Sequence, residues 1–179
     1  MDYNQLIKNW HLKASDEDYF SKFVFEYLAF IAYLKKKKFT DAINDRNAIQ
    51  KLKQDESTRD LYLQKNTNND AIKQSWQKIK KELDRAPLGN VSGNGFEVEE
   101  IKWWNCSTDQ LPSQVNHVSS GQIRDLNDWE NMVEFWHSIR NNFFHGGKNP
   151  DDARDQLVIE HGYKTLHPLV EIFLSDNKL

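Results

Sequence analysis

Residues 23–34 read Phe-Val-Phe-Glu-Tyr-Leu-Ala-Phe-Ile-Ala-Tyr-Leu, and Glu26 is the only ionised side chain among them. A helix that is apolar on nearly every side is buried all round, not along one stripe. We therefore expect a helix over about residues 16–38 that is either the centre of a bundle or a subunit interface. Ser15, followed three residues later by Asp18, predicts its start.

The same run is too short to span a membrane. A membrane-spanning helix needs about 20 apolar residues, and charged residues bracket this run on both sides well before that length is reached. We therefore expect no membrane anchor.

Composition predicts one folded domain over residues 1–179. The chain has 38% hydrophobic and 12% aromatic residues, with seven Gly and four Pro, which is typical of a helix-rich protein with an aromatic core. Cys106 is the only cysteine, and the first residues lack the basic and then apolar profile of a signal peptide, so we expect a cytoplasmic protein. The net charge of -3 excludes a broad positive field, so any contact with RNA must be local.

The remaining helices are expected from caps and apolar spacing, and they make the predicted fold all-α. Their expected ranges are about 40–55, starting at Thr40 or Asp41, then 57–64, 70–85, from 127 or 128 to 145, and 153–174 after Pro150. In the helix at 70–85, apolar residues recur at helical spacing opposite a Lys-rich face: Ile72, Trp76, Ile79 and Leu83. Pro168 is expected to kink or break the last helix near Lys164.

Residues 86–126 lack a clear helical pattern. A stretch this long exceeds the usual loop between helices, so we expect an insertion or a lid, with one irregular or small β element over residues 96–104. Trp103 and Trp104, at its end, can either stack on bases or close an edge of the core.

Chemistry-bearing side chains concentrate in the helix that begins near residue 127. Its polar stripe follows at steps of three, four and four residues: Glu134, His137, Asn141 and His145. The expected buried face is Met132, Trp136, Ile139 and Phe143. Arg140 is next to Asn141 and can reach the same patch, while Gly146 and Gly147 are the residues expected to end the helix.

The segment Arg140-Asn141-Asn142-Phe143-Phe144-His145, called here the motif segment, resembles the signature of the HEPN superfamily. That signature has an Arg, a polar residue directly after it, a short spacer and a His at the end of one helix before another begins. The resemblance covers residues 127–174 well and 10–50 loosely. It implies a HEPN-like helical bundle, usually a homodimer in which two copies of the motif form one composite site.

The resemblance also implies an activity. Many such proteins are metal-independent endoribonucleases, in which His145 would act as general acid and base, Arg140 would stabilise charge on the phosphoryl oxygens, and Asn141 would orient the phosphate or the His. No cofactor is expected, and His137 would be a supporting neighbour. We expect RNA as substrate or ligand, in a toxin or anti-phage defence protein with a possible inhibitory protein partner. The alternative is a non-catalytic interaction module that keeps the same scaffold.

The two cations of the motif segment also have a purely structural interpretation. Arg140 and His145 lie near a helix C-terminus, where positive side chains favour the helix dipole. The run Lys35–Lys38 has two interpretations as well, because it can attract phosphate or complement the end of the preceding helix.

Glu26 needs a partner, because a carboxylate inside an apolar helix is costly unless it is paired. Arg140 is the expected partner, in a supporting role for the site. The alternatives are Arg46, a tyrosine hydroxyl or solvent. His161 and His167 are expected to be structural, because nothing in the sequence places two further ligands beside them at metal spacing, and no metal site is predicted.

Overall fold

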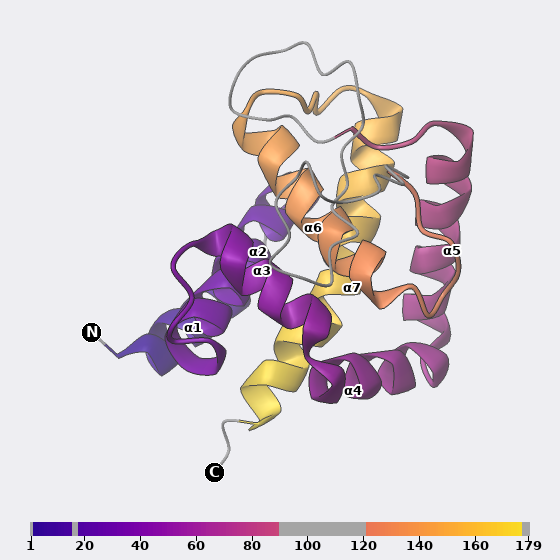
Figure 1. The fold of residues 1–179 in the computed structure, drawn as a ribbon. Coiled ribbons are helices and arrows are strands. Elements are labelled where there is room, and N and C mark those ends of the chain that lie inside the picture. The colour runs from indigo at the N-terminus through magenta and orange to yellow at the C-terminus, as the bar shows by residue number, and fades with distance from the viewer. Residues whose placement is uncertain (1, 16–17, 90–120, 177–179) are drawn as a thin grey trace.

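The computed structural model describes residues 2–15, 18–89 and 121–176. Within these ranges the chain forms seven α-helices and one short π-helix, with no strand (Figure 1). The all-α prediction is therefore confirmed for the described part of the chain. The strand expected over 96–104, the pair Trp103 and Trp104, and most of the insertion expected over 86–126 lie outside the described residues.

The helices form a bundle around α7. Their bounds are α1 (Tyr3–Lys13), α2 (Tyr19–Tyr33), the π-helix η1 (Leu34–Lys38), α3 (Asp45–Gln54), α4 (Glu56–Thr67), α5 (Asp70–Arg85), α6 (Trp129–Phe144) and α7 (Ala153–Asp176). Helix α7 packs against α2 on one side and α5 on the other, α1 covers α2, and α3 covers α6 (Figure 1). Helix α6 therefore lies against α3, α2 and α7.

Two helix starts differ from the prediction. The cap of α2 is Asp18, not Ser15, and its carboxylate accepts hydrogen bonds from the backbone N–H groups of Phe20 and Ser21, at 2.9 and 3.2 Å. Helix α3 begins after Asn44, whose side chain accepts the N–H of Asn47 at 2.8 Å. In both places an Asx side chain that reaches the first turn replaces the expected start.

Helix α1 was not anticipated from the sequence. The Asp2 carboxylate caps it by accepting the backbone N–H groups of Asn4 and Gln5. Ile7 is its buried apolar residue, and Trp10 stacks on Phe25 of α2 with ring centroids 5.6 Å apart. A helix with so few buried residues shows only a weak apolar periodicity in its sequence. Packing on α2 stabilises it nonetheless.

The core is aromatic, and hydrogen bonds join several of its buried indole and hydroxyl groups. The Trp76 indole N–H donates to the Tyr62 hydroxyl at 2.9 Å, and that hydroxyl donates to the Thr165 carbonyl at 2.7 Å. The Trp136 indole N–H donates to the Thr165 hydroxyl at 3.0 Å. These bonds join α4, α5, α6 and α7, because a buried indole or phenol needs a partner. The prediction of the buried face of α5 is confirmed in full: Ile72, Trp76, Ile79 and Leu83.

The last helix continues through its proline, so of the predicted kink or break the break does not occur. Helix α7 runs from Ala153 to Asp176 with Pro168 inside it. A proline removes one backbone hydrogen bond, but α7 packs against both α2 and α5. Tertiary packing outweighs the local preference here.

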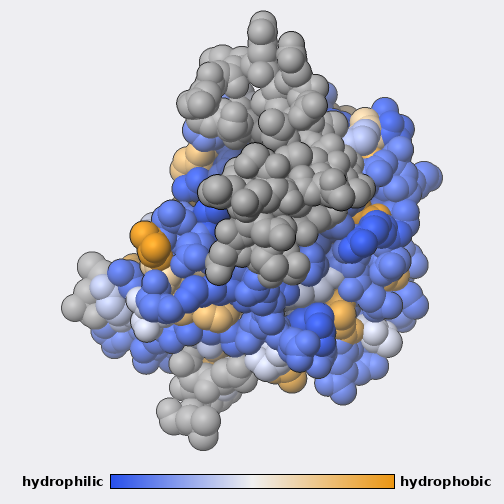
Figure 2. All heavy atoms as spheres, viewed as in Figure 1, coloured by the Kyte–Doolittle hydropathy of each residue, from blue (hydrophilic) through white to orange (hydrophobic). Residues whose placement is uncertain are grey.

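The described part of the face in Figure 2 is mostly hydrophilic. Figure 2 shows hydrophobic residues on this face as small separate patches. None of the helices in the described ranges is long and apolar enough to cross a lipid bilayer.

Candidate site at the end of helix α6

Helix α6 ends as the sequence predicts. Gly146 adopts a left-handed φ of 71°, which glycine reaches without strain. Its N–H donates to the carbonyl of Phe143 at 3.2 Å, and the N–H of Gly147 donates to that of Asn142 at 2.8 Å. This pair of bonds is a Schellman motif, and it fixes the path of the chain directly after His145.

Arg140 is held in place by side chains around it. One guanidinium nitrogen donates to the Asn141 side-chain oxygen at 3.0 Å, and another lies 3.6 Å from the carboxylate of Asp45 on α3. The guanidinium carbon also lies 5.0 Å from the centre of the Phe144 ring, within range of a cation–π contact. The Arg140 side chain remains 32% exposed, so a positioned positive charge faces solvent.

His145 is the C-cap residue of α6 and is exposed. Its backbone N–H donates to the carbonyl of Asn141 at 3.0 Å. No hydrogen bond or ion pair joins its ring to another described residue. Among the described residues, none engages the ring, so it is open to a ligand there.

The first half of the predicted polar stripe, Glu134 and His137, is buried in the core. Glu134 is fully buried, and its carboxylate lies 2.6 Å from a guanidinium nitrogen of Arg46 and 2.5 Å from the ammonium of Lys53. Burial would raise the pKa of Glu134, but the charges of Lys53 and Arg46 outweigh it and hold that pKa below its usual range. Burial lowers the pKa of Lys53, which shares its anion with Arg46.

His137 is also buried and lies next to this ionic cluster. The Tyr27 hydroxyl lies 2.9 Å from its Nδ1 atom. Burial lowers the pKa of His137 to about 4, with the charge of Glu134 opposing the shift and the positive charges of Arg46, Arg140 and Lys53 adding to it. His137 is thus a buried, neutral packing partner next to the motif segment.

Glu26 does not pair with Arg140, so that prediction is wrong, and none of the three alternatives holds. Its carboxylate oxygen Oε1 lies 2.8 Å from Nδ1 of His11 and 3.2 Å from Nδ1 of His167. The carboxylate that does lie beside Arg140 belongs to Asp45. Helix α2 presents Glu26 to His11 of α1 and His167 of α7.

The expectation that no two ligand-type side chains lie beside His167 is also wrong. His11, Glu26 and His167 come from α1, α2 and α7, and their ligand atoms lie within 4.8 Å of one another. The sequence carries no spacing signal for this cluster, because its members are on three helices. Only the buried carboxylate pointed to a special environment.

The lysine run after α2 is engaged within the fold. Lys35 lies 2.8 Å from Asp45, Lys38 lies 2.8 Å from Asp55, and Lys36 stands over the ring of Tyr3. These contacts favour the structural interpretation of the run over a dedicated phosphate-binding patch.

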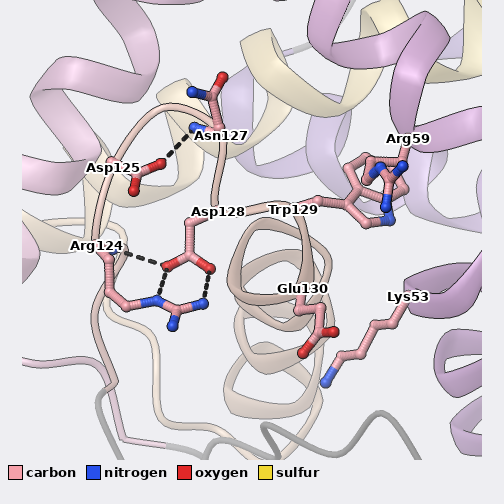
Figure 3. Close-up of a pocket in the computed structure, with 8 residues that line it drawn as sticks. All are labelled: Lys53, Arg59, Arg124, Asp125, Asn127, Asp128, Trp129 and Glu130. Atoms are coloured by element: carbon pink, nitrogen blue, oxygen red, sulfur yellow. Dashed lines mark hydrogen bonds and ion pairs between the residues drawn. The ribbon is translucent and has the colours of Figure 1, made fainter. Parts of the chain in front are cut away.

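A polar pocket of about 400 Å³ lies at the other end of α6. Figure 3 shows Arg124 and Asp128 facing each other there, joined by hydrogen bonds of 3.0 and 2.7 Å. The charges of Arg124 and Asp128 neutralise each other. The pocket lies roughly 20 Å from the motif segment, because most of the length of α6 separates them. It is therefore separate from the candidate site.

The candidate site thus consists of Arg140 and Asn141, which contact each other, and His145, which lies one turn later at the helix end. His137 lies beneath it in the core, and Glu26 is not part of it.

No family model, curated protein or solved structure matches this chain.

Proposed function

We propose that the protein is a metal-independent endoribonuclease of HEPN type, with the motif segment as its active site. The observation that carries the proposal is an exposed His145 ring at a capped helix end, about one turn after a guanidinium that contacts Asn141 and Asp45. RNA supplies its own nucleophile, so a proton-transfer group and a positive charge suffice for cleavage.

In the proposed reaction, His145 accepts the proton of a ribose 2′-hydroxyl as its oxygen attacks the adjacent phosphorus. The bond from phosphorus to the 5′-oxygen of the next nucleotide breaks, and the imidazolium that His145 has become returns the proton to that oxygen. The products are a 2′,3′-cyclic phosphate and a free 5′-hydroxyl. Arg140 stabilises the charge on the non-bridging oxygens, and Asn141 keeps the guanidinium oriented through its side-chain oxygen.

The test is incubation of purified protein with labelled RNA in EDTA, with the wild type beside His145→Ala and Arg140→Ala. Each substitution is expected to remove most of the cleavage, on the order of 100-fold or more. His161→Ala is the matched control, because it removes a histidine of α7 that is not part of the motif segment. Circular dichroism in EDTA checks that every variant stays folded. Cleavage that requires added metal, or full activity in His145→Ala, contradicts the mechanism.

A second candidate function is an interaction module that keeps the scaffold without catalysis. The contact between Arg140 and Asp45 favours it, because a guanidinium already paired with a carboxylate has less charge to offer a phosphate. In that case the wild type cleaves no RNA, and the exposed ring of Phe144 beside Arg140 becomes part of a protein-binding surface. A toxin or defence role with an inhibitory partner is compatible with either function.

A further inference from the structure

Two imidazoles and one carboxylate meet where α1, α2 and α7 pack together. Nδ1 of His11 lies 2.8 Å from Oε1 of Glu26, and Nδ1 of His167 lies 3.2 Å from the same oxygen. The two imidazole rings stack, with centroids 4.6 Å apart and planes 12° from parallel. Both rings therefore present the same edge to one carboxylate.

The carboxylate is buried and incompletely satisfied. The Glu26 side chain is 0% exposed, and its second oxygen, Oε2, has no hydrogen-bond partner among the described residues. Nδ1 of His167 also lacks a hydrogen bond of good geometry there, although it is buried. Buried charges and polar atoms in this position are costly unless a cation or a hydrogen-bond partner satisfies them.

We propose that His11, Glu26 and His167 form a binding site for one divalent transition-metal ion, of which Zn²⁺ is the representative. Two imidazole nitrogens with one carboxylate oxygen are a donor set that such ions prefer, whereas Mg²⁺ and Ca²⁺ prefer oxygen ligands. The buried carboxylate supplies negative charge, and its free oxygen Oε2 can complete a bidentate contact.

The two distances from Glu26 to the histidines fit one ion. Zinc lies about 2.0–2.1 Å from such atoms, so two ligands at an angle of roughly 90–100° are about 3 Å apart. The observed distances of 2.8 and 3.2 Å from Glu26 to the two histidines are of this size. The ligand atoms of all three side chains lie within 4.8 Å of one another, and the two stacked imidazole rings would have to turn toward each other to bind the same ion. The side chains of His11 and His167 are 16% and 28% exposed, so an ion can enter from the histidine side and water can occupy its remaining positions.

The surroundings of His167 also suit a metal ligand. Its other ring nitrogen, Nε2, lies 3.7 Å from a carboxylate oxygen of Glu171 on the next turn of α7. A ligating histidine usually turns its second nitrogen to a carboxylate, which fixes the orientation of the ring. Lys65 lies 2.7 Å from Glu171 and holds that carboxylate in turn.

An ion at this site would join the N-terminal helix to the rest of the bundle. Helix α1 is short and contributes few residues to the core, while α2 and α7 are central. Because binding to the folded state alone stabilises that state, the metal would raise the melting temperature and reduce opening of α1. This role is independent of RNA cleavage, so failure of either proposal leaves the other standing.

The test is calorimetric titration of Zn²⁺ into protein that has been stripped with a chelator and dialysed. We expect one ion per chain, with dissociation constants in the micromolar range or below, and visible absorption bands when Co²⁺ is used instead. His11→Ala and His167→Ala should each abolish binding, and Glu171→Gln should weaken it by about 10- to 100-fold. His161→Ala is the matched control, because it removes another α7 histidine outside the cluster, and its binding should equal that of the wild type.

A thermal-shift measurement gives an independent readout. Zn²⁺ should raise the melting temperature of the wild type and of His161→Ala, but not that of His167→Ala. No binding of Zn²⁺ or Co²⁺ by folded wild-type protein would overturn the proposal, and so would undiminished stoichiometric binding by His167→Ala. His11 and His167 are partly exposed, so their alanine variants should fold. They therefore test the site even where substitution of the buried ligand, Glu26→Gln, prevents folding.

Discussion

The hydroxyl of Tyr27 lies 2.9 Å from Nδ1 of His137, in a buried contact between α2 and α6. An unprotonated Nδ1 can accept the hydroxyl hydrogen, whereas an imidazolium ion there would face burial and nearby cations. Burial also raises the pKa of Tyr27 well above its usual value, so the phenol stays neutral and keeps its hydrogen. The fold therefore selects the neutral form of both side chains.

The first prediction is that protonation of His137 destabilises the fold. Its pKa is about 4 in the folded protein and 6.5 in an unfolded chain, so between these values the unfolded state binds more protons. Stability from this group is therefore fully present above pH 6.5 and is lost as the pH falls toward 4. The loss amounts to about 2 kcal/mol by pH 5.

Urea denaturation of wild type and His137→Gln, at pH 7 and pH 5, measures this effect. The variant should be less stable at pH 7 but should lose about 2 kcal/mol less between the two pH values. Other groups titrate in both proteins, so the difference between the proteins isolates His137. Equal losses in both would show that His137 does not carry the pH dependence.

The second prediction concerns the buried cluster of Lys53, Glu134 and Arg46. Lys53→Met keeps much of the side-chain volume but leaves Glu134 with one cation in place of two, and we expect a loss of about 3–5 kcal/mol of unfolding free energy. Lys51→Met is the control on the same helix, because its pair with Asp41 is exposed, and its cost should be within about 0.5 kcal/mol. Similar losses of unfolding free energy in Lys53→Met and Lys51→Met would show that the buried ion pair stabilises the fold no more than the exposed one.

The helices with strong periodicity and clear ends could be predicted from the sequence. Helix α5 matches its predicted bounds of Asp70 to Arg85, because four large apolar residues recur at helical spacing. Helix α6 ends just before Gly146 as expected, because few other residues adopt a left-handed φ. Helix α1 could not be predicted in this way, since packing on α2 stabilises it.

The environment of the site could be predicted less well than its position. The spacing of residues 134–145 places four polar side chains on one side of α6, but it does not say which other helix covers that side. Helix α3 covers Glu134, so half of the stripe became core. The partners of Glu26 were missed for a related reason, since His11 and His167 are brought to it by tertiary packing alone.

The third prediction is that Asp45 positions Arg140 for RNA cleavage. From the sequence, Glu26 was the expected carboxylate partner of Arg140. In the structure that partner is Asp45, whose carboxylate lies 3.6 Å from the Arg140 guanidinium. Asp45→Asn should lower cleavage by roughly 3- to 30-fold, because the guanidinium loses its charged anchor while His145 keeps its proton-transfer role. In an Arg140→Ala background the same substitution should have little further effect. Equal effects in both backgrounds would assign Asp45 a role that does not pass through Arg140.

The last prediction concerns assembly. The resemblance of the motif segment to a composite site leads us to expect a two-fold homodimer with the ends of the α6 helices near the axis. Phe144 is a large apolar side chain in this segment, and it is 55% exposed in the single chain. An aromatic residue of this kind at the centre of an interface contributes strongly to binding, so Phe144→Asp should shift the protein toward the monomer.

Sedimentation velocity at tens of micromolar measures this shift. Leu61→Asp is the matched control, because Leu61 is an exposed apolar residue of α4, and its variant should sediment like the wild type. Loss of the dimer in Phe144→Asp should be accompanied by loss of RNA cleavage, since a site built from two chains is incomplete in the monomer. A wild type that is monomeric at these concentrations, or an active Phe144→Asp monomer, contradicts the composite site and would place all of the chemistry on one chain.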